Sequence, residues 1–220
     1  MARLLLLAST GDEADRIAGK CRDAFSDVTA FHGDWGQPLP PELHDWSGDV
    51  ILSYCSRWVV PQWLLDRAPL ALNFHPAPPE YPGIGGLNWA LYEGDKSFGV
   101  TCHHMVRKVD AGPIVEVVRF PIFAKDDVPA LFDRAHVHLE ALAGRVIGQL
   151  ADGWAAPASD DAWSTETRSR AELDAMMDVP ADASDAEIAR RRRAFEFGRW
   201  KLRVPARPMP HILEAWTGFP

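Results

Sequence analysis

Cysteine is scarce in this sequence, and its pattern excludes two classes of protein. The chain has 220 residues and three cysteines, Cys21, Cys55 and Cys102, which are widely spaced and form no C-x-x-C pair. Small disulfide-stabilised domains need paired cysteines, and zinc or redox sites usually contain C-x-x-C. We therefore expect buried or half-buried thiols in a reducing, cytoplasmic compartment.

A long apolar run is also absent. The first apolar segment, residues 4–8, is five residues long before the polar stretch that begins at Ser9. A secretory signal requires about 7–15 apolar residues and a membrane-spanning helix requires about 20. We expect no membrane partner, and the short run again favours a cytoplasmic location.

Positive charge is in short supply. Lys and Arg number 23 against 31 Asp and Glu, so the formal net charge is −8 at pH 7. A surface that holds a nucleic-acid backbone needs clustered positive charge, and we expect no nucleic-acid partner. The balance still allows small anionic ligands held by a few local arginines.

Short apolar runs alternate with helical patterns through the first 150 residues. The pattern predicts strands at residues 3–8, 27–31, 50–56, 70–74, 98–105 and 113–122. Residues 12–25 and 127–153 carry apolar side chains at helical spacing. Strands that alternate with helices indicate an α/β fold, a Rossmann-like, mostly parallel sheet flanked by helices.

A change of composition near residue 150 predicts a domain boundary. Residues 1–150 form the expected catalytic domain, and the stretch that follows is polar and lacks periodicity. Residues 151–220 are expected to form a linker and a small helical or irregular C-terminal extension. One helix of this extension should begin at Ser184, because Ser184 and Glu187 have the spacing of a capping box.

Two polar residues end one of the predicted strands. Asn73 and His75 are two positions apart, so they share one face of the strand. Four prolines follow within the next seven residues and prevent helix or strand from continuing. Two polar groups aimed together at the end of a strand look like half of an active site.

A second polar group follows on the next two strands. Thr101 and His103 share one strand face, and Asp110 lies in a turn marked by Gly112 and Pro113. If this strand pair lies beside the strand of His75, Asp110 can approach His75. The adjacent His103 and His104 point to opposite faces of a strand and cannot bind one ion together, so we expect no metal site.

These two motifs resemble those of the 10-formyltetrahydrofolate-dependent formyltransferases. The chain reads NFHP at residues 73–76 and GVTCHHMVRKVDAGPIV at residues 99–115, in the order of the family. The family includes the methionyl-tRNA, glycinamide ribonucleotide and sugar-nucleotide N-formyltransferases. The resemblance implies the formyltransferase fold, 10-formyltetrahydrofolate as co-substrate without a metal, and Asn73, His75 and Asp110 as the catalytic residues.

The implied chemistry suits these three side chains. An amine attacks the formyl carbon and passes through a tetrahedral oxyanion, to which Asn73 can donate a hydrogen bond. His75 can take the proton of the amine, or stabilise the oxyanion as imidazolium. Asp110 would hold the imidazole tautomer and raise its pKa, or anchor a water that relays protons. The resemblance also implies a folate pocket, which we expect at Ser56, Arg57, Trp58, Val109 and Asp110.

The acceptor is expected to be an amino sugar. The loop PAPPEYPG departs from the usual family loop, which faces the acceptor. The helix around ARRRRAF resembles one near the C-terminus of the sugar N-formyltransferases, which implies a nucleotide-linked amino sugar, a homodimer and a role in glycan biosynthesis. For the acceptor we expect a stacking contact from the ring of Tyr81. Gly83 and Gly85 should let the acceptor approach the backbone, and Arg193 should bind the diphosphate.

Three alternatives stay open. A 10-formyltetrahydrofolate hydrolase keeps the same Asn, His and Asp but uses water as acceptor. A formyltransferase could also act on another amine, that of methionyl-tRNA or of a ribonucleotide. A non-catalytic module that binds folate or a nucleotide is disfavoured, because a binder needs no proton acceptor beside an oxyanion donor.

Overall fold

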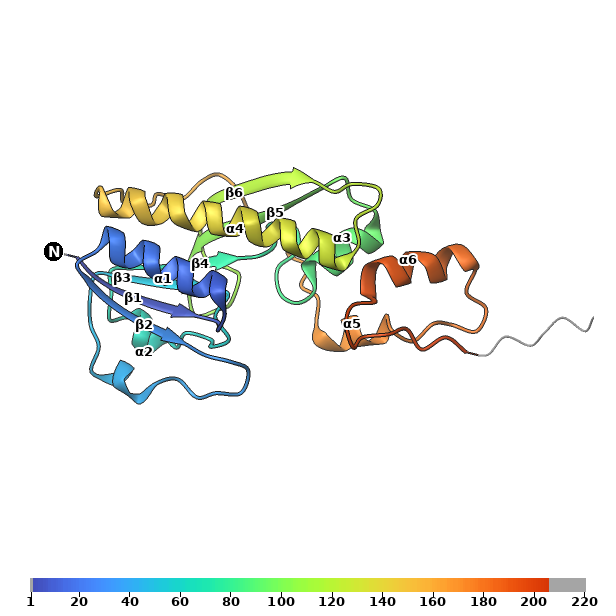
Figure 1. Cartoon of the computed structure of the whole chain (residues 1–220), viewed down its shortest axis with the longest axis horizontal. Helices are drawn as coiled ribbons and strands as arrows, with labels where there is room; N and C mark the ends of the chain where they lie inside the picture. The colour runs from blue at the N-terminus through green and yellow to red at the C-terminus, as the bar shows by residue number, and fades with distance from the viewer. Residues whose placement is uncertain (1, 206–220) are drawn as a thin grey trace, which may run out of the picture.

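A single six-stranded sheet organises the chain. The computed structural model describes residues 2–205. The strands are β1 (Arg3–Ala8), β2 (Asp27–His32), β3 (Val50–Tyr54), β4 (Leu70–His75), β5 (Ser97–His104) and β6 (Ile114–Pro121), in the spatial order β2-β1-β3-β4-β5-β6 (Figure 1). The first four are parallel, whereas β5 runs antiparallel to β4 and β6 antiparallel to β5. The predicted α/β, mostly parallel sheet is confirmed.

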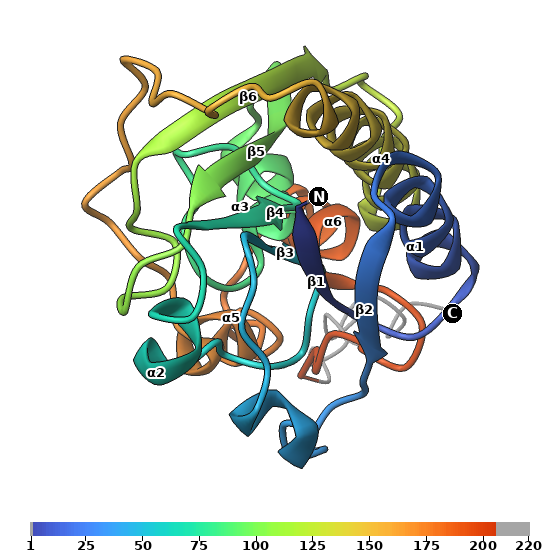
Figure 2. The same ribbon diagram turned by 90° about the vertical axis from the view of Figure 1, so that its left-hand side faces the viewer.

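Helices cover both faces of this sheet. Helices α1 (Asp12–Ala24) and α4 (Val128–Ala151) lie on one face, and the 3-10 helix η1 (Pro41–His44) and α2 (Gln62–Leu65) lie on the other (Figure 2). Helices α3 (Gly86–Glu93), α5 (Arg170–Ala175) and α6 (Asp185–Phe195) gather beyond one end of the sheet (Figure 1). No helix of residues 2–205 is long and apolar enough to cross a membrane.

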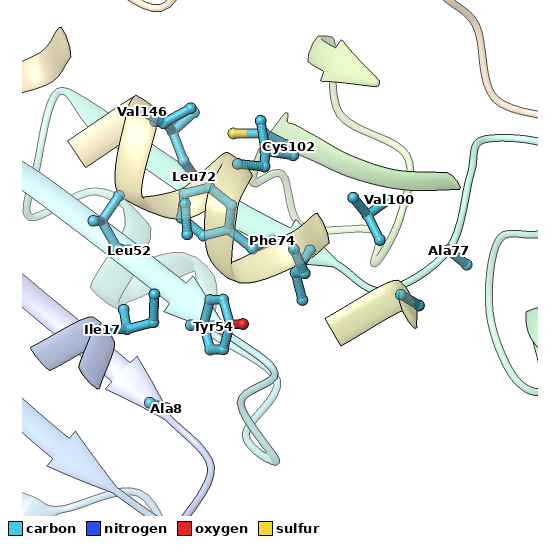
Figure 3. Close-up of a cluster of buried hydrophobic side chains, with 14 of the residues drawn as sticks. Ala8, Ile17, Leu52, Tyr54, Leu72, Phe74, Ala77, Val100, Cys102 and Val146 are labelled. Atoms are coloured by element: carbon cyan, nitrogen blue, oxygen red, sulfur yellow. The ribbon is translucent and has the colours of Figure 1, made fainter. Parts of the chain in front are cut away.

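The core explains why β1 is apolar from Leu4 to Ala8. Leu4 and Leu6 belong to the cluster under α1 and α4, which Figure 3 shows around Leu52, Leu72 and Phe74. The alternating Leu5 and Leu7 belong to a second cluster on the opposite face, with Leu43, Trp46, Ile51 and Leu64. All four leucines of β1 are fully buried. Each contributes roughly 1.5–3 kcal/mol of burial free energy, so β1 anchors the sheet from both sides.

The connection after α4 runs back along the sheet. Residues 154–168, which we name the strap, pass β6 and the β5–β6 turn before they reach α5 (Figure 2). The strap is tied to the sheet and to the proline-rich loop: the Ser159 amide donates to the Ile114 carbonyl at 2.7 Å, and the Ser164 amide to the Pro79 carbonyl at 2.9 Å. The segment predicted as a polar linker is therefore fixed against residues 1–150. The division of the chain into two domains stays a prediction.

Helix α6 completes the C-terminal extension. Its N-cap is Ser184, whose side chain accepts from the Glu187 amide, so the predicted start of this helix is confirmed. The helix packs on α3, where Trp89 and Phe195 meet edge to face at 5.5 Å and Asn88 donates to the Ala194 carbonyl at 2.7 Å.

Candidate active site

The two sequence motifs meet at one place in the fold. Strand β4 ends at His75, and the β5–β6 turn brings Asp110 back beside it: Nδ1 of His75 lies 3.5 Å from Oδ1 of Asp110. His75 is 10% exposed at its side chain and Asp110 is 8% exposed, so both are shielded from water. The predicted convergence of the strand end and the turn is present in the structure.

The turn of Asp110 has an unusual backbone. Asp110 has φ of +48°, in the left-handed region that aspartate tolerates better than most residues. Its carboxylate accepts from the Gly83 amide at 3.2 Å, which ties the turn to the proline-rich loop. Two residues later the turn passes so close to β5 that a Cβ on Gly112 would lie 1.9 Å from the His104 carbonyl oxygen. Only glycine fits there, which explains its place after the aspartate.

A fourth polar residue fixes Asn73. Nδ1 of His103 lies 2.8 Å from its neighbour's backbone carbonyl, that of His104, and donates its proton there. Nε2 of His103 is then an acceptor, and it takes one N–H of the Asn73 amide at 3.0 Å. This contact sets which end of the Asn73 amide carries the protons, and it leaves the second N–H free.

The two histidines of β5 separate as predicted. The ring of His103 lies in the site, with Nε2 at 3.7 Å from the Asp110 carboxylate. The ring of His104 points to the other side of the sheet edge, where Nε2 contacts the Ala156 carbonyl at 2.8 Å.

Burial decides the charge states of the central pair. Burial lowers the pKa of His75 below its ordinary value of 6.5, and the partly compensating attraction of Asp110 does not restore it. Burial acts to raise the pKa of Asp110, but the rings of His103 and His75 and the Gly83 amide outweigh it, so this pKa is lowered. Asp110 acts to raise the His75 pKa, as predicted, but desolvation exceeds this attraction, so the net shift is downward. At pH 7 the pair is a neutral imidazole beside a carboxylate.

A cavity of about 460 Å³ opens over these residues. Asn73, His75 and Asp110 line it together with the other four residues predicted for the folate site: Ser56, Arg57, Trp58 and Val109. Gly83 and Gly85 also line it, both with positive φ. This size is ordinary for a small-molecule site.

Two aromatic residues flank the mouth of the cavity near β3. The indole N–H of Trp58 donates to the Gln37 carbonyl at 2.9 Å, and the ring packs on Gly33 so closely that a Cβ there would overlap it. Trp35, 73% exposed, lies under the guanidinium of Arg57 at 5.0 Å. Trp58 is therefore fixed in place, whereas Trp35 and Arg57 face solvent.

Two predicted acceptor contacts are wrong. The ring of Tyr81 is buried, and its hydroxyl shares its one proton between the carboxylates of Glu93, at 2.9 Å, and Asp95, at 2.7 Å, so the ring cannot stack on a ligand in the cavity. Arg193 lies outside the cavity lining, because its guanidinium binds the carbonyls of Asp126 at 2.7 Å and Phe123 at 3.2 Å. Its role is to fasten α6 to the turn before α4.

The other three arginines of the run are also engaged within the protein. Arg190 and Arg191 bind Glu187 on the same helix, and Arg192 lies 3.3 Å from Glu196. These four arginines point in different directions around α6, and three of them stabilise this helix by ion pairs with Glu187 and Glu196.

Sequence reasoning missed the roles of three residues of the site. It placed His103 on one strand face with Thr101 and weighed it as a metal ligand, but it did not foresee the contact of His103 with Asn73. His136 lines the cavity from α4 and binds Glu13 at 2.7 Å. Trp163 of the strap contacts both histidines from outside the two motifs. No local pattern links this tryptophan to the strands.

The lining of the cavity is more cationic than the chain as a whole. Arg57, Lys108 and Arg170 line it, and Asp110 is the carboxylate among the described lining residues. A second, more apolar hollow of about 220 Å³ adjoins it between α3, α4, α5 and α6, and Phe132 and Arg170 line both. The site therefore offers cations at two places to ligands that carry negative charge.

Comparison with known proteins agrees with the two motifs. Residues 39–146 match the family model described as formyl transferase. Over 99 residues the chain is 36% identical to the methionyl-tRNA formyltransferase of Latilactobacillus sakei, a match that covers 43% of this chain and 31% of that enzyme. The chain thus spans about a third of the length of this curated relative.

Solved structures share most of the described fold. A sugar N-formyltransferase from Shewanella superposes with a TM-score of 0.72 at 16% identity, covering 90% of this chain and 89% of the other. The N-formyltransferase of Helicobacter canadensis, solved with folinic acid and dTDP-3-aminofucose, gives 0.70 at 17% identity, covering 90% and 81%. At such identities the likeness concerns the fold.

Proposed function

We propose that the chain, whose residues 39–146 match the formyl transferase family model, moves the formyl group of 10-formyltetrahydrofolate to the amine of a nucleotide-linked amino sugar. The observation that carries the proposal is the convergence of Asn73, His75 and Asp110 at one cavity. An amide donor, a neutral imidazole and a carboxylate are the groups that acyl transfer to an amine requires.

The amine is activated by His75. The nitrogen lone pair of the acceptor attacks the formyl carbon, and the carbonyl π electrons move to oxygen. His75, neutral because it is buried, takes the proton that the nitrogen must lose. The carboxylate of Asp110 faces Nδ1 at 3.5 Å and is a stronger acceptor than the Tyr81 carbonyl, which lies 3.5 Å from Nε2. The ring proton is therefore kept on Nδ1, and Nε2 is the base. Collapse of the intermediate breaks the bond to N10, which leaves with a proton as tetrahydrofolate.

The oxyanion is stabilised by Asn73. One N–H of its amide is held by His103, so the second points in a fixed direction before substrate arrives. A preorganised donor of this kind contributes roughly 3 kcal/mol to transition-state stabilisation. Every step uses side chains of the protein, and the proposal includes no metal.

The folate is proposed to lie against the loop after β3 and the Asp110 turn. Ser56, Trp58 and Val109 line that part of the cavity, and Arg57 and Lys108 offer positive charge to the glutamate tail. The neighbour from Helicobacter canadensis was solved with folinic acid, a related folate, which supports this choice of co-substrate.

The acceptor is proposed to span both hollows. Its amino sugar would reach His75 in the larger one, and its base would lie in the apolar hollow that Phe195, Phe197 and Trp200 line. Arg170 lines both hollows and is placed to bind the diphosphate between them. The neighbour solved with dTDP-3-aminofucose supports an acceptor of this class.

Arg170→Ala should raise the KM for the nucleotide sugar about tenfold to a hundredfold, because it removes a charge-assisted contact to phosphate. The value of kcat and the KM for 10-formyltetrahydrofolate should change less than about threefold. Arg22→Ala, on the exposed face of α1, is the matched control. An unchanged KM for the sugar would remove Arg170 from the acceptor site.

The pH profile reports the charge state of His75. Since burial lowers its pKa, the base form is present above that value and is lost as the pH falls through it. We expect kcat/KM to fall with unit slope on the acidic side, with the midpoint of that fall below pH 6.5. A plateau that begins well above pH 7 contradicts a neutral buried imidazole.

The direct test is an assay with 10-formyltetrahydrofolate and a panel of nucleotide-linked amino sugars. An N-formylated sugar with one equivalent of tetrahydrofolate supports the proposal. Formate as the product indicates a hydrolase, and formylation of methionyl-tRNA or of a ribonucleotide amine in parallel assays indicates another acceptor. Binding of folate without turnover indicates a non-catalytic module.

We also propose the setting of this activity. Nucleotide-linked N-formyl sugars are building blocks of glycans, so the enzyme would act in glycan biosynthesis in the cytoplasm, as a homodimer like the sugar N-formyltransferases that the sequence resembles. Sedimentation of the purified chain tests the oligomeric state.

A further inference from the structure

The strap contacts the active-site residues through the side chain of Trp163. It is anchored on both sides of this residue: the His104 ring contacts the Ala156 carbonyl at 2.8 Å, and the Ile84 amide donates to the Arg168 carbonyl at 3.3 Å. Between these anchors Trp163 turns inward and is half-buried. Residues 159–161 and 164–168 around it are polar and irregular, so the inward position of this tryptophan needs a reason.

Trp163 touches three parts of the catalytic group at once. Its ring meets His103 edge to face, with centroids 5.0 Å apart at 89°, and meets His75 at 5.8 Å and 70°. Its indole N–H donates to the Gly112 carbonyl at 2.7 Å. Gly112 belongs to the turn that carries Asp110, so the one side chain contacts the base, the histidine that orients Asn73 and the turn of the carboxylate.

We propose that Trp163 is a positioning residue, which clamps the rings of His75 and His103 to the Asp110 turn from outside the cavity lining. The inference concerns the active site of the proposed formyltransferase, and its turnover readout rests on that function.

Two features of the turn make such a clamp necessary. Asp110 has a left-handed backbone, which persists only where its surroundings hold it. The described side-chain hydrogen bonds that hold the turn are the long contact from the Gly83 amide, at 3.2 Å, and the shorter one from the Trp163 indole to Gly112. The indole bond is thus the stronger of the two restraints.

The indole ring of Trp163 also accounts for the low solvent exposure of the two histidines. The side chain of His103 is 3% exposed and that of His75 10%, although both border an open cavity. The groups that act on the charge of His75 are Asp110 and His103, with the Tyr81 carbonyl. Lys108, Arg170 and His136 line the same cavity. Removal of the indole admits water beside the ring and leaves those groups in place.

Two substitutions separate the two kinds of contact. Trp163→Phe keeps an aromatic ring but loses the N–H to Gly112, and Trp163→Ala loses both. Proton NMR titration of the imidazoles, with His75 assigned from the His75→Asn spectrum, measures the pKa of His75 without turnover. We expect Trp163→Ala to raise this pKa toward 6.5 and Trp163→Phe to leave it nearer the wild-type value.

Turnover gives the second readout. We expect kcat to fall about tenfold to a hundredfold in Trp163→Ala and several-fold in Trp163→Phe, with the KM for 10-formyltetrahydrofolate nearly unchanged. The acidic limb of the pH profile should move to higher pH in Trp163→Ala. Trp63→Phe is the matched control, because Trp63 also packs on a histidine, His44, at 4.4 Å, but lies outside both hollows.

The outcomes distinguish the inference from the proposed function. An unchanged His75 pKa in Trp163→Ala, or kcat equal to wild type in both variants, overturns the clamp. If Trp163→Ala does not fold, wild-type kcat in Trp163→Phe overturns the indole contact. If the wild-type protein transfers no formyl group, the proposed function fails, and the titration of His75 still decides whether Trp163 shields that ring.

Discussion

Replacing His75 with alanine is expected to lower kcat for formyl transfer by about three orders of magnitude, because general base catalysis contributes roughly 10²–10⁴-fold and His75 is the base of the proposed mechanism. The side chain is nearly buried beside a carboxylate, and burial lowers its pKa, so it is ready to take a proton at neutral pH. Rapid-quench measurement of one turnover isolates the chemical step.

The control for this prediction is binding. The folate is proposed to contact mainly the loop after β3, so its Kd, measured by quenching of tryptophan fluorescence, should stay within a few-fold of wild type in His75→Ala. His44→Ala is the matched histidine variant, since His44 is exposed and stacks on Trp63 outside the cavity. Comparable turnover in His75→Ala and His44→Ala removes His75 from the mechanism.

Asn73→Ala is expected to lower kcat by about 10²–10³-fold, the usual cost of removing one preorganised oxyanion donor. The amide is oriented before substrate binds, because His103 accepts one of its protons at 3.0 Å. The loss should appear in kcat and leave the KM for folate nearly constant, since the oxyanion exists only in the transition state and the intermediate.

A related variant tests the orientation itself. His103→Ala keeps the Asn73 amide but removes the acceptor that fixes it, so kcat should fall by a smaller factor than in Asn73→Ala. The double variant should cost little more than Asn73→Ala alone, because the two residues act as a unit. Fully additive losses would show that His103 contributes through another route.

Periodicity was enough to predict most of the fold. The strands at β1 and β3 are continuous apolar runs because both faces are covered, and the described sheet contains both where expected. The long helix of residues 127–153 has its apolar stripe on the core and corresponds to α4. Local spacing reports burial directly, which is why these elements were predictable.

The catalytic group was predictable because it lies on regular elements. Alternation along β4 placed Asn73 and His75 on one face, and the Gly-Pro turn returned Asp110 to them. The same alternation on β5 indicated His103, but nothing in the sequence showed that it would hold the Asn73 amide.

The predictions were wrong where contacts between residues distant in the sequence set the direction of a side chain. Tyr81 follows three prolines of an irregular loop, and its direction is set by Glu93 and Asp95 at the end of α3. Arg193 faces the turn before α4 because α6 packs there. The lowered pKa of His75 depends on burial by distant segments, including the strap, and such burial has no local signature.

The central claim is that Asn73, His75 and Asp110 act together on one formyl carbon. The most direct test is a single-turnover reaction with isotopically labelled 10-formyltetrahydrofolate and the preferred amino sugar, in which labelled N-formyl sugar and labelled formate are counted for wild type and Asp110→Asn. The account predicts that wild type places nearly all of the label on the sugar nitrogen, and that Asp110→Asn slows this transfer by at least about a hundredfold. Label recovered mainly as formate in wild type, or transfer by Asp110→Asn at the wild-type rate, would contradict it.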